Sequence, residues 1–150
     1  TLTIGDDVYK LQQFHFHAPS ENEIDGQTYP LEGHFVYKTD NGKITVVSVL
    51  YNYGDENQAL KQIWDKMPQA ANTETELSQP ISLDDFYPED KDYYNFEGSL
   101  TTPPCTEGVN WIVFKNQETV SKEQVEKFTQ TLGFKNNRPI QDTNGRQIKE

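Results

Sequence analysis

The segment VYKLQQFHFH, residues 8–17, decides how the rest of the sequence is interpreted. Its side chains fall into two sets, one with Tyr9, Leu11, Gln13, His15 and His17 and the other with Phe14 and Phe16. Alternation with a period of two indicates a β-strand, because successive side chains point to opposite faces of a sheet. We therefore predict a strand that carries two histidines on one face, roughly 6.6–6.8 Å apart along the chain.

Three more strands are predicted downstream of this segment. Residues 32–39 and 43–53 form two of them, and the Asp40-Asn41-Gly42 sequence between them favours a tight hairpin. Asn and Gly tolerate the positive φ angles that such a turn requires. A shorter run at residues 111–115 is the last candidate strand.

Two helices are predicted from capping residues and apolar spacing. The first has Asp55 as its N-cap and ends at Pro68; the second begins after Ser121, with Gln124 in a capping box, and ends at Gly133. Their apolar faces consist of Leu60, Ile63, Trp64 and Met67 in the first and Val125, Phe128 and Leu132 in the second. Residues 73–92 are acidic and interrupted by prolines, so we predict mostly irregular structure there. Because strands outnumber helices, the expected fold class is mainly β, with a few peripheral helices.

Length and charge limit the function classes. The chain has 150 residues, and we expect residues 1–150 to form a single domain with its own core. A formal net charge of −11 argues against binding to nucleic acid or to an anionic membrane, since both require a basic surface. No apolar run approaches the roughly 20 residues of a membrane span, and no signal peptide is visible. The opening TLTIGDDVYK reads like the middle of a sheet, so we expect the domain to be incomplete at its N-terminus.

The chain contains three histidines, and all of them fall on the first two predicted strands. His15 and His17 share a face, and His34 can join them if the strands pair. Three neutral imidazoles with an open fourth position are typical of a catalytic zinc site. Gln13 and Glu32 each precede a histidine by two residues, so each shares its face and can accept the second ring N–H. A single histidine is more often an ordinary surface or core residue, but the shared face favours a metal site.

Several motifs together resemble the α-class carbonic anhydrase family, in its bacterial type. They are QFHFHAPSE at residues 13–21, Glu32-Gly33-His34, EGSLTTPPCTEGVNW at residues 97–111 and NNRP at residues 136–139. These motifs stand in the family's order, and the resemblance covers essentially the whole chain. It implies a central, twisted, mostly antiparallel sheet with a few peripheral helices. It also implies a zinc-dependent lyase that reversibly hydrates CO₂ to bicarbonate and a proton.

The resemblance implies roles for individual residues. His15, His17 and His34 match the zinc ligands, and Gln13 and Glu32 match the partners of the ligand rings. Thr101 and Glu21 match the catalytic pair, in which the threonine hydroxyl donates to the glutamate and can then only accept from the nucleophile. The positions that match the substrate wall are Val36, Val46, Leu100, Thr102 and Trp111.

The resemblance also implies partners and a location. CO₂ or bicarbonate is the expected substrate, sulfonamide-type compounds or anions are expected inhibitors, and the expected location is periplasmic or secreted. No histidine remains for a proton shuttle, and the single cysteine, Cys105, matches one whose partner lies upstream in relatives. A homodimer, or a second chain that supplies the missing strands, is compatible with these departures.

Two alternatives stay open. In a cupin-type site, His15, His17, Glu21 and His34 would bind iron or manganese, although cupins have no SLTTPP loop. A fragment that holds zinc in an incomplete cavity, with little activity, is the other alternative. Acatalytic modules related to carbonic anhydrases lose one or more ligand histidines, and this chain keeps all three.

Overall fold

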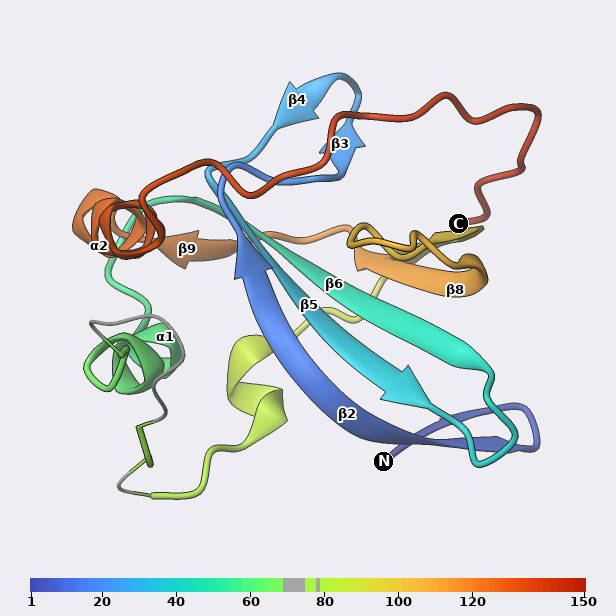
Figure 1. The fold of residues 1–150 in the computed structure, drawn as a ribbon, viewed down its shortest axis with the longest axis horizontal. Helices are drawn as coiled ribbons and strands as arrows, with labels where there is room; N and C mark the ends of the chain where they lie inside the picture. The colour runs from blue at the N-terminus through green and yellow to red at the C-terminus, as the bar shows by residue number, and fades with distance from the viewer. Residues whose placement is uncertain (69–74, 78) are drawn as a thin grey trace.

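A seven-stranded mixed sheet forms the centre of the molecule (Figure 1). The computed structural model describes residues 1–68, 75–77 and 79–150. The strand order is β1-β2-β5-β6-β8-β7, and β9 also pairs with β6. The pairs β6–β8 and β6–β9 are parallel and the others are antiparallel. The strand bounds are β1 Leu2–Ile4, β2 Asp7–His17, β5 Leu31–Lys38, β6 Ile44–Tyr53, β7 Tyr93–Ser99, β8 Glu107–Phe114 and β9 Glu118–Val120. The predicted mainly β fold is confirmed.

The three long strands β2, β5 and β6 carry the histidines. β2 pairs with β5 so that His15 lies directly opposite His34, and β5 pairs with β6 so that His34 lies opposite Ser48. The predicted turn between β5 and β6 is confirmed, with Gly42 at a φ of 94°. A short separate hairpin, formed by β3 (Glu23–Ile24) and β4 (Gln27–Thr28), connects β2 to β5.

The helix α1 spans Gln58–Trp64, and its predicted N-cap was wrong. Asn57 is the N-cap in place of Asp55, because its side chain accepts a hydrogen bond from the backbone N–H of Leu60. The helix ends at Trp64, before the predicted stop at Pro68.

The helix α2 spans Lys122–Leu132, and both of its predicted caps are confirmed. Ser121 and Gln124 form the capping box, and Gly133 adopts the left-handed conformation at the C-cap. The Gln124 amide also exchanges hydrogen bonds with the Asn57 main chain, which ties α2 to the start of α1 (Figure 1).

The stretch predicted to be irregular holds one short 3-10 helix, η1, at Leu83–Phe86. Residues 73, 74 and 78 of that prediction lie outside the described residues. The strand β7 was not predicted; it pairs with β8 along its length and forms one edge of the sheet.

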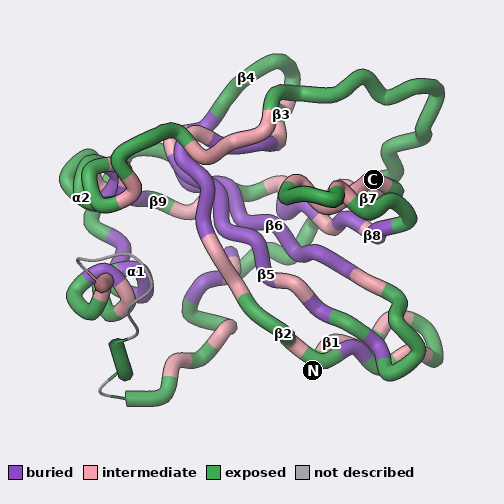
Figure 2. The backbone as a smooth tube through the Cα atoms, viewed as in Figure 1, coloured by how far each residue is buried: buried purple, intermediate pink, exposed green. Residues whose placement is uncertain are grey.

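The two faces of the sheet bury different clusters. Odd-numbered residues of β6, such as Val47 and Val49, join Phe16 and Phe35 in a core shared with both helices. Even-numbered residues, such as Val46, belong to a second cluster with Trp111. Figure 2 shows β5 and β6 as the most continuously buried strands. In the described ranges, no helix is long and apolar enough to cross a membrane.

Candidate metal centre

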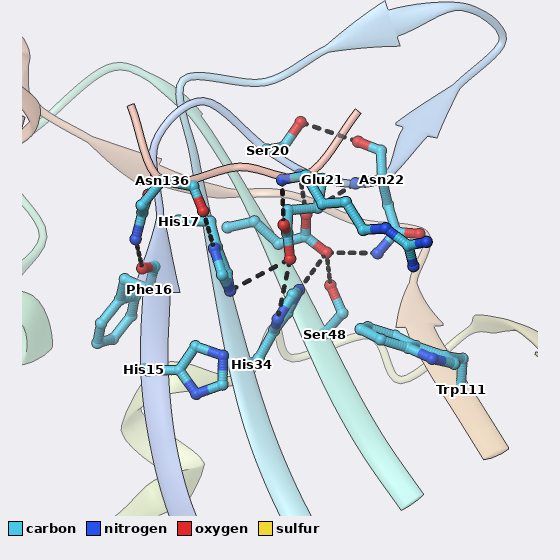
Figure 3. Close-up of polar contacts among 12 residues, drawn as sticks. His15, Phe16, His17, Ser20, Glu21, Asn22, His34, Ser48, Trp111 and Asn136 are labelled. Atoms are coloured by element: carbon cyan, nitrogen blue, oxygen red, sulfur yellow. Dashed lines mark hydrogen bonds and ion pairs between the residues drawn. The ribbon is translucent and has the colours of Figure 1, made fainter. Parts of the chain in front are cut away.

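The three imidazoles come together on the face of the sheet opposite the aromatic core (Figure 3). One ring nitrogen from each of His15, His17 and His34 lies within 4.8 Å of the others. The ring centroids are 4.7–5.3 Å apart. His17 and His34 are buried, and His15 is half-buried. The β2–β5 register produces this cluster, because it places His34 directly across from His15.

Each imidazole has one nitrogen engaged by an acceptor. His15 Nδ1 lies 2.7 Å from Gln13 Oε1, His17 Nδ1 lies 2.9 Å from the main-chain oxygen of Asn136, and His34 Nε2 lies 2.8 Å from Glu32 Oε1. Amide and carboxylate oxygens only accept hydrogen bonds, so we assign the ring proton to these nitrogens. The lone pairs then lie on Nε2 of His15, Nε2 of His17 and Nδ1 of His34.

The centre concentrates electron-rich atoms that lack a positive partner. His17 Nε2 is buried without a hydrogen-bond partner in the described part of the chain, and so is Glu21 Oε1, which lies 3.2 Å away. The same carboxylate oxygen is 3.8 Å from His34 Nδ1. A lone pair that faces a carboxylate oxygen in a buried site is unfavourable unless a proton or a cation neutralises it. Imidazole nitrogens are common zinc ligands, so the residues present fit a zinc ion.

The environment keeps the rings of His15 and His17 neutral, the form that binds metal. Burial, together with the neighbouring His34 and His17, lowers the pKa of His15 to about 4. Burial and His34 also lower the pKa of His17, against the opposing influence of the Asn136 carbonyl and of Glu21. Both rings are therefore neutral at pH 7.

Glu32 is the most heavily hydrogen-bonded side chain of the centre. Its Oε2 accepts from the main-chain N–H groups of Glu21 (2.7 Å) and Asn22 (2.9 Å). Its Oε1 accepts from His34 Nε2, from Ser48 Oγ (2.6 Å) and from Asn22 Nδ2 (2.5 Å). Burial acts to raise the pKa of Glu32, but His34 and the other donors lower it to about 2. The carboxylate thus stays ionised and holds the His34 proton on Nε2.

Of the predicted catalytic pair, Glu21 lies beside the histidines, and its predicted hydrogen bond with Thr101 is not formed. Glu21 directs Oε1 at His17 and Oε2 at the main-chain N–H of Arg138 (2.5 Å). Because Oε1 has no hydrogen-bond partner among the described residues, the expected bond from Thr101 is not formed in this structure. Thr101 is half-buried, and it lines the same cavity of about 480 Å³ as Glu21 and Trp111.

The residues expected to form an apolar wall lie mostly together. Val46 and Trp111 are buried in one cluster, and Val36 and Leu100 pack against it. The Trp111 ring meets His34 edge-on at 4.9 Å, so this cluster adjoins the metal centre (Figure 3). Thr102 is exposed and is not part of the cluster.

Two residues of the centre have no assigned role in the sequence analysis. Ser48 is a small polar residue within an otherwise apolar strand. That interruption was the signal in the sequence that could have indicated a role for it. Asn136 lies 119 residues from His17, so no local pattern links the two. Only the fold brings them into contact.

Comparisons with known proteins find the same family by sequence model and by individual relatives. A sequence model of the family described as eukaryotic-type carbonic anhydrase matches residues 2–150. Curated relatives include a carbonic anhydrase from Pectobacterium carotovorum, 45% identical over 99% of this chain and 61% of its own length. Another, from Neisseria gonorrhoeae, is 47% identical over 100% of this chain and 59% of its own. The chain thus spans about three fifths of the length of these relatives.

A solved structure agrees with the sequence matches. The α-carbonic anhydrase from Thermovibrio ammonificans, in complex with the inhibitor sulfanilamide, superposes with a TM-score of 0.94 at 47% identity. The match covers 97% of this chain and 64% of that one.

Proposed function

This chain belongs to the eukaryotic-type carbonic anhydrase family, and on that premise we propose that it catalyses the zinc-dependent, reversible hydration of CO₂ to bicarbonate and a proton. One observation carries the proposal. Three imidazole lone pairs, each fixed by a hydrogen bond at the opposite ring nitrogen, meet at one buried point. Three nitrogen ligands with one open position are the ligand set of catalytic zinc sites.

His15 Nε2, His17 Nε2 and His34 Nδ1 would hold the zinc ion. Zinc bound there supplies a nucleophile at neutral pH by acidifying a water molecule, a role for which carbonic anhydrases are the standard example. Glu32 and Gln13 keep the ring protons of His34 and His15 away from the ligand atoms, so that both rings stay ready to bind.

The apolar cluster is proposed to receive CO₂. The side chains of Val36, Val46 and Leu100 offer no hydrogen bonds, which suits a nonpolar linear substrate. The indole N–H of Trp111 donates to the Ser99 carbonyl, so it too is unavailable to the substrate. Bicarbonate is charged and hydrated, so such a wall favours its departure.

Thr101 and Glu21 are proposed to orient the nucleophile. Glu21 would accept the Thr101 hydroxyl proton, so that Thr101 presents a lone pair towards the metal centre. This contact requires Glu21 Oε1 to turn from His17 towards Thr101 while Arg138 retains Oε2. This role is supported by Glu21, which reaches His17 and His34 and lines the same cavity as Thr101. Because the three histidines are used as ligands, the released proton would leave through buffer or through a shuttle other than these histidines.

The test is stopped-flow CO₂ hydration with zinc quantified in the same sample. We expect one zinc per chain and measurable hydration, both lost together in His15→Ala and His34→Ala. Hydration by a sample without metal would overturn the assignment. Binding of a sulfonamide to the zinc-loaded chain is a second expectation, since a relative is known in complex with sulfanilamide.

A zinc-binding protein with little turnover is the second candidate. The observation that supports it is that Thr101 donates no hydrogen bond to Glu21 in this structure. Stoichiometric zinc without hydration would support it. The cupin-type alternative is not supported, because the family is a different one and the cluster of ligand atoms found in the described residues consists of histidines alone.

A further inference from the structure

Asn136 surrounds His17 with hydrogen bonds from three directions. Its main-chain oxygen accepts from His17 Nδ1 at 2.9 Å. Its side-chain oxygen accepts from the Ala18 N–H at 3.0 Å, and its side-chain nitrogen donates to the Phe16 carbonyl at 2.9 Å. The main-chain groups on both sides of His17 are thus held by one amide. Figure 3 shows Asn136 beside His17 and Phe16, on the extended segment that follows α2.

The amide occupies an edge of β2 that, among the residues the structure describes, has no strand partner at His17. One side of β2 pairs with β5, and the register places Glu32 opposite His17. On the other side, β1 pairs only with residues 7–9. A carboxamide offers one donor and one acceptor with the geometry of a peptide group, so Asn136 replaces a neighbouring strand at the position of His17.

We propose that the side-chain amide of Asn136 is a positioning group of the metal centre, which fixes the main chain of His17 and thereby sets zinc affinity. The inference rests on the proposed function, since it concerns the same histidines. The ring of His17 is aimed by the main-chain oxygen of Asn136, which survives any substitution of the side chain. The amide acts one step earlier, by holding the backbone that carries the ring.

The physical reason is the narrow tolerance of a three-nitrogen site. His17 is the last residue of β2, and a strand end that is paired on one side alone frays readily. Fraying spreads the position of Nε2 relative to the other two ligands, so the fraction of molecules ready to bind falls. Loss of partners that orient metal ligands typically weakens metal affinity about 10–100-fold.

Asn57 provides a matched control. Its amide also makes two side-chain bonds to the main chain, accepting from the Leu60 N–H at 3.0 Å and donating to the Thr119 carbonyl at 3.0 Å. It caps α1 on the opposite side of the sheet from the histidines and is buried. Asn57→Ala therefore removes the same kind of bonds without touching the centre.

The experiment measures the zinc dissociation constant by chelator competition and the visible absorption of the Co²⁺-loaded chain. We expect Asn136→Ala to bind zinc at least about 10-fold more weakly and to shift the Co²⁺ bands. The zinc dissociation constant of Asn57→Ala should stay within about 2-fold of the parent value, with unchanged Co²⁺ bands. This should hold even if the unfolding midpoint of its metal-free form falls as far as that of Asn136→Ala. Asn136→Asp keeps an acceptor for Ala18 but loses the donor to Phe16, so we expect an intermediate affinity.

Asn136→Asp carries the test if Asn136→Ala does not fold. The inference is overturned if the Asn136 variants that fold bind zinc within about 2-fold of the parent, or if Asn57→Ala weakens zinc binding as much. A parent chain that binds no zinc would overturn the proposed function as well. If the parent binds zinc and Asn136→Ala binds it with the same dissociation constant, this inference alone would be overturned.

Discussion

Glu32→Gln is the substitution that most sharply tests how the centre is organised. The carboxylate is fully buried and accepts five hydrogen bonds, two at Oε2 and three at Oε1. A glutamine has the same shape but only one oxygen. Its NH₂ group must therefore face donors wherever it points, and the two orientations fail in different ways.

If the NH₂ takes the place of Oε2, the main-chain N–H groups of Glu21 and Asn22 lose their acceptor. Each buried donor left unpaired costs about 1–3 kcal/mol, so the free energy of unfolding should fall by about 2–6 kcal/mol. If the NH₂ takes the place of Oε1, His34 must accept at Nε2 and carry its proton on Nδ1. That proton occupies the ligand atom, and zinc affinity should fall about 10–100-fold.

Both quantities are measured on the same variant. Urea unfolding of the metal-free chain gives the free energy of unfolding, and chelator competition gives the zinc dissociation constant. Glu118→Gln is the control. Glu118 is half-buried on β9, and burial raises the pKa of its carboxyl, which favours the neutral form. A neutral amide is accommodated there, and we expect a change within about 0.5 kcal/mol.

The reasoning would be refuted by a Glu32→Gln chain that loses less than about 1 kcal/mol and binds zinc within about 2-fold of the parent. Ser48→Ala is a milder perturbation of the same carboxylate, since it removes one donor to Oε1 of Glu32 and leaves the two main-chain bonds to Oε2 intact. We expect it to cost about 1 kcal/mol and to leave the His34 proton in place.

Three further predictions concern the bound metal, the packing at Gly98 and the N-cap of α2. Removing zinc with a chelator should lower the unfolding midpoint of the loaded chain, because zinc that binds only the folded state stabilises it by about 4 kcal/mol when free zinc is at 1,000 times the dissociation constant. Calorimetry with and without zinc checks this, and equal midpoints would contradict it. Gly98→Ala should cost about 1–3 kcal/mol in denaturant unfolding, because a Cβ there would lie 2.9 Å from Trp111 Cδ1, and an unchanged midpoint would count against the described packing. Ser121→Ala should cost about 1 kcal/mol by removing the capping box of α2, as circular dichroism melts can show, while zinc affinity stays the same; an affinity loss would contradict the separation of α2 from the centre.

The sequence was informative where a local rule governs the structure. The parity of β2 placed His15 and His17 on one face because side chains alternate along any strand. The ends of α2 were predicted because its capping box and C-cap glycine act within one turn. The position of Glu32 beside His34 follows from the same alternation.

Longer-range contacts escaped prediction. Asn57 caps α1 in place of Asp55 because its main chain also pairs with Gln124, which lies 67 residues away. The hydrogen bonds of the Asn136 side chain to Phe16 and Ala18 depend on a segment that follows the last helix and returns to the end of β2. The orientation of Glu21 depends on Arg138 in the same segment. Spacing along the chain carries no signal for such contacts.

The most direct test of the central claim is zinc K-edge X-ray absorption on the loaded chain. The geometry predicts one zinc with three imidazole nitrogens at about 2.0–2.1 Å, the distance typical of histidine ligands. In His15→Ala, His17→Ala and His34→Ala, zinc occupancy should fall, and any zinc that still binds should have one imidazole fewer. A zinc ion with fewer than three imidazoles, or with a spectrum that these substitutions leave unchanged, would contradict the account.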